Sequence, residues 1–433
     1  MDQTPRKHIT PGDAARLTGI DKRRLWHPFT PMREWCAPGH EPLILVSGHG
    51  AMLRDSAGRE YIDGNSSIWT NIHGHNHPVI NQAIRAQLEQ VAHTSFLGFT
   101  NPPAIELAHE LVKIASPERL TRVFFSDDGS TAIEVAIKMA LQYFQIMAQP
   151  GRTRFVAFAN GYHGDTLGAA SLGGISLFQG RFSGHHFPVE HVASVVDLVA
   201  LGEPETIAAV VIEPLIQGAA GMRPWPRGLL AAVRRWCDQS GVLLIADEVM
   251  TGFGRTGTMF AFQQEAAVPD FLALAKGLTG GFMPLAATLT TDLIFEAFHG
   301  ETFYYGHSYC GNQLGCAAAV ASLRVFEAED VLANLEPKIG VLVRRLERLR
   351  ANPHVREVRQ CGFIAGIELG GPDSTVLDPI QRTGTHVCLA ARSHGLLTRP
   401  ILDTVVLMLP LCATAAQIDQ ACDAIEMAIG ETL

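Results

Sequence analysis

The sequence predicts an α/β fold, with a large domain around a mostly parallel sheet flanked by helices and a small α+β domain that is discontinuous in the chain. First, apolar runs of strand length alternate with helical patterns from about residue 120 onward. Second, several of these runs are apolar throughout, which is typical of strands covered by helices on both faces. Third, the chain has 433 residues, 47% of them hydrophobic, which is more than a single core normally holds.

The N-terminal part predicts short strands followed by two helices. Residues 43–62 contain the strand-like segments LILVSG, AMLRDSAG and REYID with a Ser-Ala-Gly turn, so they predict a small β-meander. Helices are predicted from Pro78 to Ala92 and from Pro103 to Ala115. Each begins with proline, which the first turn of a helix tolerates.

The middle of the chain alternates strands with helices, and the end of the chain is mixed. The predicted central strands are TRVFFSD, RFVAFANG, AAVVIEP, VLLIADE and FLALAKG, with the helices STAIEVAIKMALQYF and LLAAVRRWCDQSG between them. The C-terminal part predicts a helix over 335–349, the strands VREVRQ and FIAGIEL, and a final helix IDQACDAIEMAI. We therefore expect a large domain over 61–325, and a small domain formed by 1–60 together with 326–433.

Composition excludes several classes of protein. The 34 basic and 43 acidic side chains give a net charge of −9, which argues against nucleic acid or an anionic membrane as the main partner. The eight cysteines are scattered without a CxxC pair, as in reduced cytosolic proteins. Residues 1–10 are polar, unlike a signal peptide, and no later stretch is apolar for the length of a membrane span. These features predict a cytoplasmic protein.

Lys276 is one of only six lysines, and it directly follows the apolar strand of DFLALAKGLTGG. Loss of hydration at such a place lowers the pKa of an amine and makes it a nucleophile. The alternative is an ordinary strand-end lysine that reaches solvent. In open α/β sheets, however, ligands bind beyond the carboxyl ends of the strands, which is where Lys276 is predicted to lie.

Asp247 ends the apolar strand of VLLIADEV, where a buried carboxylate needs a cationic partner. The alternative is a loop aspartate that caps the next turn. Together, Lys276 and Asp247 meet two demands of pyridoxal phosphate (PLP), which needs an amine for a Schiff base and a carboxylate for its ring nitrogen. The pair therefore predicts a PLP site.

A phosphate site and a ring contact are also predicted. Asp128-Gly129-Ser130 follows a strand and begins a helix, so its N–H groups and the Ser130 hydroxyl can bind a phosphate. Tyr162, in the loop NGYHGDT, can stack on the cofactor ring, although an aromatic residue in such a loop is more often ordinary packing.

Two other patterns indicate weaker alternatives. His73, His75 and His77 alternate in NIHGHNHP and would share one face of a strand as metal ligands, but Gly74, Asn76 and Pro78 favour a loop, so we predict no metal. The segment GFGRTG resembles a nucleotide-binding loop, but it lacks the G-x-G-x-x-G spacing and no clear helix follows it.

The order of GYHGDT, IEP, IADEVMTGFGRTG, LALAKGLTGG and a late TRP resembles the class III aminotransferases of PLP fold type I, over nearly the whole chain. Within that class, LWHPFTPM, DGNSSIWTNIHGHNHP, SDDGSTAIEVAIKMALQYF and PLIQGAAGMR resemble the members that convert 8-amino-7-oxononanoate to 7,8-diaminononanoate in biotin biosynthesis. The resemblance implies the same fold, cofactor and transamination.

The resemblance also implies roles for residues around the cofactor. Lys276 corresponds to the Schiff-base lysine, Asp247 to the carboxylate at the pyridine nitrogen, and Tyr162 to the tyrosine stacked on the ring. Residues 129–130 correspond to the phosphate turn. Glu213 of IEP corresponds to an acid near the cofactor that positions the Asp247 region.

Two further residues are implied to complete the site. Ser308 corresponds to a hydroxyl that reaches the phosphate from the other subunit, which implies a homodimer with active sites at its interface. Arg399 of LLTRP corresponds to the arginine that binds the carboxylate of 8-amino-7-oxononanoate, a bidentate contact that suits a guanidinium.

This chain departs from the usual pattern around one pocket. Phe29 replaces a tyrosine, Ile68-Trp69 replaces a Trp-Trp pair, Gly306-His307-Ser308 replaces Gly-Pro-Thr, and Val406 replaces a late tyrosine. These changes resemble members that use lysine as amino donor instead of S-adenosylmethionine, the usual donor. Asp128 replaces a serine beside the phosphate, and we expect it to turn away or to cap the helix.

Three alternatives stay open at this point. The nearest is another class III aminotransferase that acts on an ω-amino compound, against which HPFT, SSIW and TRP count. A PLP-dependent mutase or decarboxylase would share Lys276 and Asp247 but would not alternate between two substrates. A catalytically silent PLP-fold binding protein is disfavoured because the cofactor residues are all present.

Overall fold

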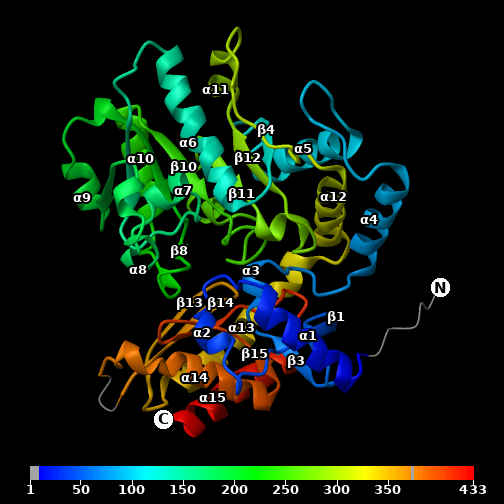
Figure 1. Ribbon diagram of the computed structural model, residues 1–433. Coiled ribbons are helices and arrows are strands. Elements are labelled where there is room, and N and C mark those ends of the chain that lie inside the picture. Colours follow the sequence, from blue (N-terminus) through cyan, green and yellow to red (C-terminus); the bar gives the residue numbers. More distant parts are fainter. Residues whose placement is uncertain (1–8, 372–374) are drawn as a thin grey trace.

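The computed structural model describes residues 9–371 and 375–433, and its centre is a seven-stranded sheet with the order β4-β12-β11-β10-β7-β5-β6 (Figure 1). The strand β12 runs antiparallel to both of its neighbours, and the other paired strands of this sheet are parallel. The mostly parallel sheet is therefore confirmed. Its strands are β4 (Arg122–Ser126), β5 (Arg154–Phe158), β6 (Val189–Val192), β7 (Ile207–Ile212), β10 (Leu243–Asp247), β11 (Phe271–Leu274) and β12 (Ala286–Thr290).

Helices cover both faces of this sheet. On one face, α6 (Gly129–Ile146) packs on side chains such as Val211 and Ile245; on the other, α5 (Pro102–Ala115) and α10 (Leu229–Ser240) join a core with Val210. Burial on both faces explains why β7 is apolar throughout. The remaining helices of this part are α4 (Pro78–Gln90), α7 (Leu167–Leu172), α8 (Ser176–Gln179), α9 (Val195–Ala200), α11 (Asp292–Ala297) and α12 (Gln313–Ala328).

The two ends of the chain meet in a second, smaller part below the central sheet in Figure 1. One sheet has the order β1-β2-β3-β15, in which β15 pairs in parallel with β3, so strands from both ends share one sheet. A second sheet has the order β13-β14-β17-β16. The strands are β1 (Leu45–His49), β2 (Met52–Asp55), β3 (Glu60–Asp63), β13 (Val355–Cys361), β14 (Ile364–Leu369), β15 (Leu396–Leu397), β16 (Pro400–Ile401) and β17 (Thr404–Leu407).

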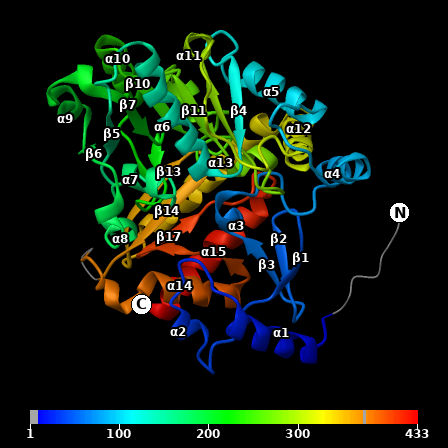
Figure 2. The same cartoon turned by 45° about the horizontal axis from the view of Figure 1, so that its top comes forward.

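Helices from both ends complete this smaller part, and Figure 2 shows the C-terminal ones beside β13, β14 and β17. The helices are α1 (Pro11–Arg24), α2 (Met32–Trp35), α3 (Ser66–Trp69), α13 (Val331–Arg350), α14 (Thr383–Ala390) and α15 (Ala415–Thr432). A short pair, β8 (Ile216–Gln217) with β9 (Arg223–Pro224), lies outside these three sheets. The shared β3–β15 sheet supports a discontinuous small domain, while the boundaries after residues 60 and 325 stay a prediction.

The strands and helices that the sequence predicts are present in this structure. The antiparallel meander β1-β2-β3 and the helices that begin at Pro78 and near Pro103 are confirmed. Within the described residues, no helix is long and apolar enough to cross a membrane. Of the polar N-terminal stretch 1–10, residues 1–8 lie outside the described residues.

Candidate active site

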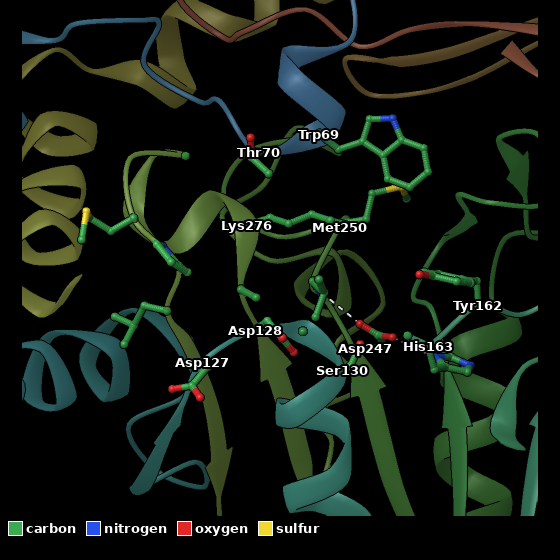
Figure 3. A pocket seen from close by; sticks show the side chains of 18 of the residues that line it. Trp69, Thr70, Asp127, Asp128, Ser130, Tyr162, His163, Asp247, Met250 and Lys276 are labelled. Atoms are coloured by element: carbon green, nitrogen blue, oxygen red, sulfur yellow. Dashed lines mark hydrogen bonds and ion pairs between the residues drawn. The ribbon is translucent and has the colours of Figure 1, made fainter. Parts of the chain in front are cut away.

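A cavity of about 520 Å³ lies where the carboxyl ends of the central strands face the smaller part of the molecule (Figure 3). Residues at or shortly after the carboxyl ends of β4, β5, β7, β10 and β11 line it, together with the start of α6 and the end of α3. The lining includes Trp69, Thr70, Asp127, Asp128, Gly129, Ser130, Tyr162, His163, Glu213, Asp247, Met250 and Lys276. The strand ends thus bring together Lys276, Asp247, Tyr162, Glu213 and the 128–130 turn, which the sequence places far apart.

The Lys276 amine is buried in this cavity. Burial lowers the pKa of Lys276, while the carboxylates of Asp247 and Glu213 act in the opposite direction. Its Nζ lies 4.9 Å from the centre of the Trp69 ring. It makes no hydrogen bond or ion pair with any residue in the described part of the chain. A desolvated amine without such a partner is suited to act as a nucleophile.

Asp247 is held by His163 of the GYHGDT motif, a residue that was not among the predicted site residues. Oδ2 of Asp247 lies 2.8 Å from Nδ1 of His163, and Oδ1 accepts a hydrogen bond of 3.1 Å from the N–H of Val249. Burial by itself lowers the pKa of His163, but the hydrogen bond with Asp247 and its negative charge outweigh burial, so the pKa is raised. His163 is therefore the cationic partner that a buried Asp247 requires.

Glu213 connects two loops of the cavity. Its Oε1 accepts a hydrogen bond of 3.1 Å from the N–H of Tyr162, and its Oε2 accepts one of 2.8 Å from the N–H of Gly218. Burial raises the pKa of Glu213 to about 7, although nearby His163 and the two N–H donors act in the opposite direction. These contacts fix the backbone at Tyr162, whose hydroxyl donates to Oδ2 of Asp165 at 2.8 Å.

The start of α6 forms a site suited to an anion. Asp128 caps the helix by accepting a hydrogen bond of 2.9 Å from the N–H of Thr131, which confirms the expected capping. The N–H groups of Gly129 and Ser130 donate to no atom in the described residues, so they remain available at the positive helix end. A Cβ at residue 129 would lie only 2.7 Å from Cγ1 of Val249, so the turn has room only for glycine.

A left-handed turn forms the upper wall of the cavity. Ser66, Ser67, Ile68 and Trp69 all have positive φ angles, between 44° and 68°, and none of them is glycine. Left-handed backbone costs about 1–2 kcal/mol per such residue, so other contacts must hold this turn. Trp69, the last of the four, turns its indole toward the cavity above Lys276 (Figure 3).

Comparison with known proteins identifies the family. The family model for class-III aminotransferases matches residues 36–429. The chain belongs to the class-III aminotransferases. It is 45% identical to the adenosylmethionine-8-amino-7-oxononanoate aminotransferase of Geobacter sulfurreducens over 446 residues, which cover 96% of this chain and 98% of that relative. The enzyme of the same name from Nitratidesulfovibrio vulgaris is 48% identical, over 94% of this chain and 80% of its own.

Solved structures of related enzymes have the same fold. The adenosylmethionine-8-amino-7-oxononanoate aminotransferase of Methanocaldococcus jannaschii is 40% identical with a TM-score of 0.94, covering 96% of this chain and 99% of that one. A PLP-bound amine transaminase from an uncultivated Pseudomonas species is 33% identical with a TM-score of 0.87, covering 95% of this chain and 99% of that one. These matches establish the PLP-dependent aminotransferase fold and the cofactor.

The cavity of this class-III aminotransferase fits PLP. A buried amine without a hydrogen-bond partner among the described residues is present for the aldehyde, at Lys276. A carboxylate with a cationic partner is present for the ring nitrogen, at Asp247. At the start of α6, the N–H groups of Gly129 and Ser130, which donate to no atom of the described residues, are present for the phosphate. The volume of about 520 Å³ is within the usual range for a cofactor pocket.

Several residues predicted for the site do not line this cavity. Phe29 lies in an adjoining pocket of about 230 Å³ that shares Tyr162 with the cavity. Ile68 and Arg399 are exposed, although Ile68 belongs to the turn that holds Trp69. Val406 is buried against Met250, a residue of the cavity wall. Their roles in substrate binding stay predictions.

The segment 306–308 lies beside the start of α6 without lining the cavity. His307 binds through Nδ1 to Oδ2 of Asp127 at 2.8 Å and through Nε2 to the hydroxyl of Tyr305 at 3.0 Å. Gly306 and Ser308 are exposed. In this chain, the segment therefore contributes no side chain to its own cavity.

The alternating histidines of NIHGHNHP have three different partners. His73 binds Ser322, His75 binds Asp63 and His77 binds Glu329. Among the described residues, no cluster of three or more His, Cys, Asp or Glu side chains could hold a metal ion.

The GFGRTG loop joins separate segments of the chain around its arginine. Arg255 is fully buried, and its guanidinium donates to the carbonyls of Leu409 at 2.7 Å and Asn71 at 2.8 Å. Burial lowers the pKa of Arg255 to about 9, while the charge of Asp63 acts in the opposite direction. In this structure the loop holds the segment after the left-handed turn.

The titration of Glu213 predicts a pH-dependent stability. A carboxyl group whose pKa is raised by folding, here from 4.5 to about 7, contributes stability that is full below pH 4.5 and is lost as the pH rises through 7. Glu213→Gln removes this titration. The free energy of unfolding of the wild type, relative to that of the variant, should therefore fall over this range by at most about 3 kcal/mol. Urea unfolding at several pH values measures this difference, and parallel profiles would contradict the prediction.

Proposed function

We propose that this class-III aminotransferase converts 8-amino-7-oxononanoate to 7,8-diaminononanoate in biotin biosynthesis. The observation that carries the proposal is the Lys276–Asp247 cavity in a chain that is 45% identical, over nearly its whole length, to an enzyme named for this substrate. The HPFT, SSIW and TRP segments support this substrate over another ω-amino compound.

PLP, when bound, supplies an aldehyde that combines with amines and a ring that takes up electrons from the substrate carbon. Lys276 would hold the aldehyde through its desolvated amine, and as a free amine it would accept and return the proton of the substrate carbon. Asp247 would place a negative charge at the ring nitrogen, because His163 and the Val249 N–H fix its carboxylate. The start of α6 would bind the phosphate.

Arg399 and Phe29 are proposed to bind the substrates. Arg399 is exposed and makes no hydrogen bond or ion pair within the described part of the chain, so its guanidinium is free to bind a carboxylate. Phe29 lies in the pocket that adjoins the cavity at Tyr162, with Phe178 at a ring distance of 5.8 Å. This aromatic pocket fits an apolar part of a substrate.

We also propose a homodimer in which Ser308 reaches the phosphate of the partner's site. This proposal is supported by large apolar side chains exposed near residue 306: Leu97 is 72% exposed, Phe99 71% and Tyr304 88%. A Cβ at Gly306 would lie 3.8 Å from Cδ2 of Leu97, so the segments are neighbours. Apolar patches of this kind mark protein interfaces. A cytoplasmic location is supported by the eight free cysteines.

The amino donor can be tested with the purified yellow enzyme. S-adenosylmethionine and lysine are added separately, and loss of the yellow absorption reports transfer of an amino group to the cofactor. Phe29, Ile68, His307 and Val406 predict that lysine bleaches the enzyme. Bleaching by S-adenosylmethionine alone would show that these four changes do not alter the donor.

The acceptor is tested in the second half of the same experiment. The bleached enzyme should recover its yellow absorption when 8-amino-7-oxononanoate is added, with one equivalent of 7,8-diaminononanoate detected by mass spectrometry. Recovery with a simple ω-oxo acid but not with 8-amino-7-oxononanoate would contradict the proposed substrate. Return of the colour by an external ketone would also exclude a decarboxylase, which does not alternate between two substrates.

A further inference from the structure

The left-handed turn at Ser66–Trp69 is closed by its own backbone. The N–H of Trp69 donates to the carbonyl of Asn65 at 2.8 Å, and the N–H of Thr70 donates to the carbonyl of Ser66 at 2.9 Å. Ser67 and Ile68 have ψ angles of 50° and 56°, so the segment is one turn of left-handed helix. Side chains other than glycine disfavour this conformation, so the turn needs support from outside.

Asp63 supplies that support on the N-terminal side of the turn. Its carboxylate is buried at 3% exposure and accepts hydrogen bonds from the N–H of Ser67 at 2.9 Å and from the Ser67 hydroxyl at 2.8 Å. The same carboxylate lies 2.9 Å from Nε2 of His75. Oδ1 therefore binds the turn at Ser67, and Oδ2 binds both Ser67 and, beyond the turn, His75.

The contacts of Asp63 continue to the C-terminal side of the turn. Nδ1 of His75 lies 3.1 Å from Nδ2 of Asn71, and Oδ1 of Asn71 accepts a hydrogen bond of 2.7 Å from the N–H of Gly74. An amide NH₂ group can only donate, so Nδ1 accepts and Nε2–H donates to Asp63. Asp63, His75 and Asn71 thus form a chain of hydrogen bonds from one end of the turn to the other.

The turn determines where the indole of Trp69 lies. The indole sits above Nζ of Lys276, and its own Nε1 is buried without a hydrogen-bond partner among the described residues. Glycines leave room for this placement. A Cβ at Gly218 would lie 3.3 Å from Cζ3 of Trp69, and a Cβ at Gly281 would lie 2.7 Å from the carbonyl oxygen of Thr70. A relaxed, right-handed backbone would carry the indole away from the lysine.

We infer that Asp63 is a positioning residue, which holds Trp69 over the amine of Lys276 by stabilising the left-handed turn between them. It acts through Ser67, His75 and the backbone, and it does not itself line the cavity. The inference rests on the proposed function only for its activity measurement, because the position of Trp69 can be measured without any substrate.

The test compares three variants of the holoenzyme. Asp63→Ala removes the support. Asp63→Ala with Ser67→Gly relieves the backbone strain at residue 67, where φ is 51° and glycine adopts a positive φ without strain. The Ser67 side chain is exposed, so its removal leaves no cavity. Asp55→Ala is the matched control, because Asp55 is similarly buried at 2% exposure and binds Arg59 and Tyr61, neither of which belongs to the turn.

The readout is acrylamide quenching of Trp69 fluorescence. Each protein is compared with the same protein carrying Trp69→Phe, so that the other tryptophans cancel. Asp63→Ala should raise the quenching constant of Trp69 by about twofold or more and lower kcat/KM by about tenfold, the effect of losing a strong local hydrogen-bonding support. The added Ser67→Gly should regain most of both losses, and Asp55→Ala should change neither.

Three results would overturn the inference. The first is unchanged Trp69 quenching in a folded Asp63→Ala protein, the second is no recovery with Ser67→Gly, and the third is an equal change in Asp55→Ala. If Asp63→Ala does not fold, Asp63→Asn takes its place, since its amide oxygen still accepts from the Ser67 N–H while its NH₂ group cannot accept from His75. If the wild type does not act on the proposed substrate, the proposed function is contradicted. The fluorescence measurement still tests the position of Trp69, because it needs no substrate.

Discussion

Replacing Lys276 with alanine is expected to abolish amino transfer while the protein still binds PLP. The variant loses the amine that binds the aldehyde and the group that moves the proton at the substrate carbon. Loss of proton transfer alone lowers kcat by about 10²–10⁴-fold. The phosphate site at the start of α6 and the Asp247 carboxylate remain, so PLP should bind non-covalently. Stopped-flow absorbance measures amino transfer, and absorbance titration with PLP measures its binding, which borohydride should leave without a covalent bond to the protein.

The matched control for this experiment is Lys338→Ala. Lys338 is also a partly buried lysine whose pKa is lowered by burial, and its Nζ donates to the carbonyl of Leu411 at 2.6 Å. It does not line the cavity, so its loss should reduce stability without stopping amino transfer. Normal turnover in Lys276→Ala would remove the basis for the proposed mechanism.

Many strands and helices of the fold could be predicted from the local hydrophobic pattern, and those that could not be predicted have physical causes. The strands β5, β7, β10 and β11 were predictable because they are almost entirely apolar and buried. The edge strand β6, VEHV, was not predicted, because its two middle residues are polar and exposed. The helix α12 gives no amphipathic signal, since its alanine-rich segment QLGCAAAVASLRVFEA is buried on most sides. The antiparallel direction of β12 depends on how it pairs with β4 and β11, which no local pattern encodes. The polar helix α1 has no buried residue and therefore no apolar stripe.

Residues of the candidate site were predictable where a charged side chain follows an apolar strand, because such a position is unusual for a charge. A lysine and an aspartate that directly follow apolar strands are such cases, at Lys276 and Asp247. His163 was not predictable in this way, because its contact with Asp247 depends on the order of the strands. That order places the loop after β5 near the end of β10. A buried aspartate demands a cation, and the histidine of GYHGDT was an available candidate. The left-handed turn at Ser66–Trp69 has no sequence signal, because none of its residues is glycine and distant contacts impose its conformation.

Asp247→Asn is expected to lower the rate of amino transfer by about 10²–10³-fold, the usual effect of removing one preorganised electrostatic contact from an active site. The substitution keeps the shape of the side chain but removes its negative charge. His163 is buried, and without the charge of Asp247 only the charge of Glu213 still acts against burial, so the pKa of His163 should fall. The ring nitrogen of PLP then has no anion beside it to keep its proton. Single-turnover kinetics with the amino donor measure this loss.

The matched control is Asp270→Asn. Asp270 is another buried aspartate of the central sheet, at 8% exposure, and it binds Arg234 at 2.8 Å and the N–H of Leu244 at 2.8 Å. It precedes β11, at the end of the sheet opposite the cavity, so its replacement should lower the free energy of unfolding and leave the rate nearly unchanged. A similar loss of rate in both variants would mean that Asp247 acts on the structure only.

Comparing Asp247→Asn with Lys276→Ala separates the covalent binding of PLP from the rate of amino transfer. The charge of Asp247 raises the pKa of Lys276, so removing that charge should leave the lysine amine more often uncharged and still able to bind the aldehyde. Asp247→Asn is thus expected to stay covalently loaded and to react slowly, whereas Lys276→Ala loses the covalent bond itself. An Asp247→Asn protein that cannot be trapped by borohydride would show that the carboxylate is needed for loading, and would contradict this division of roles.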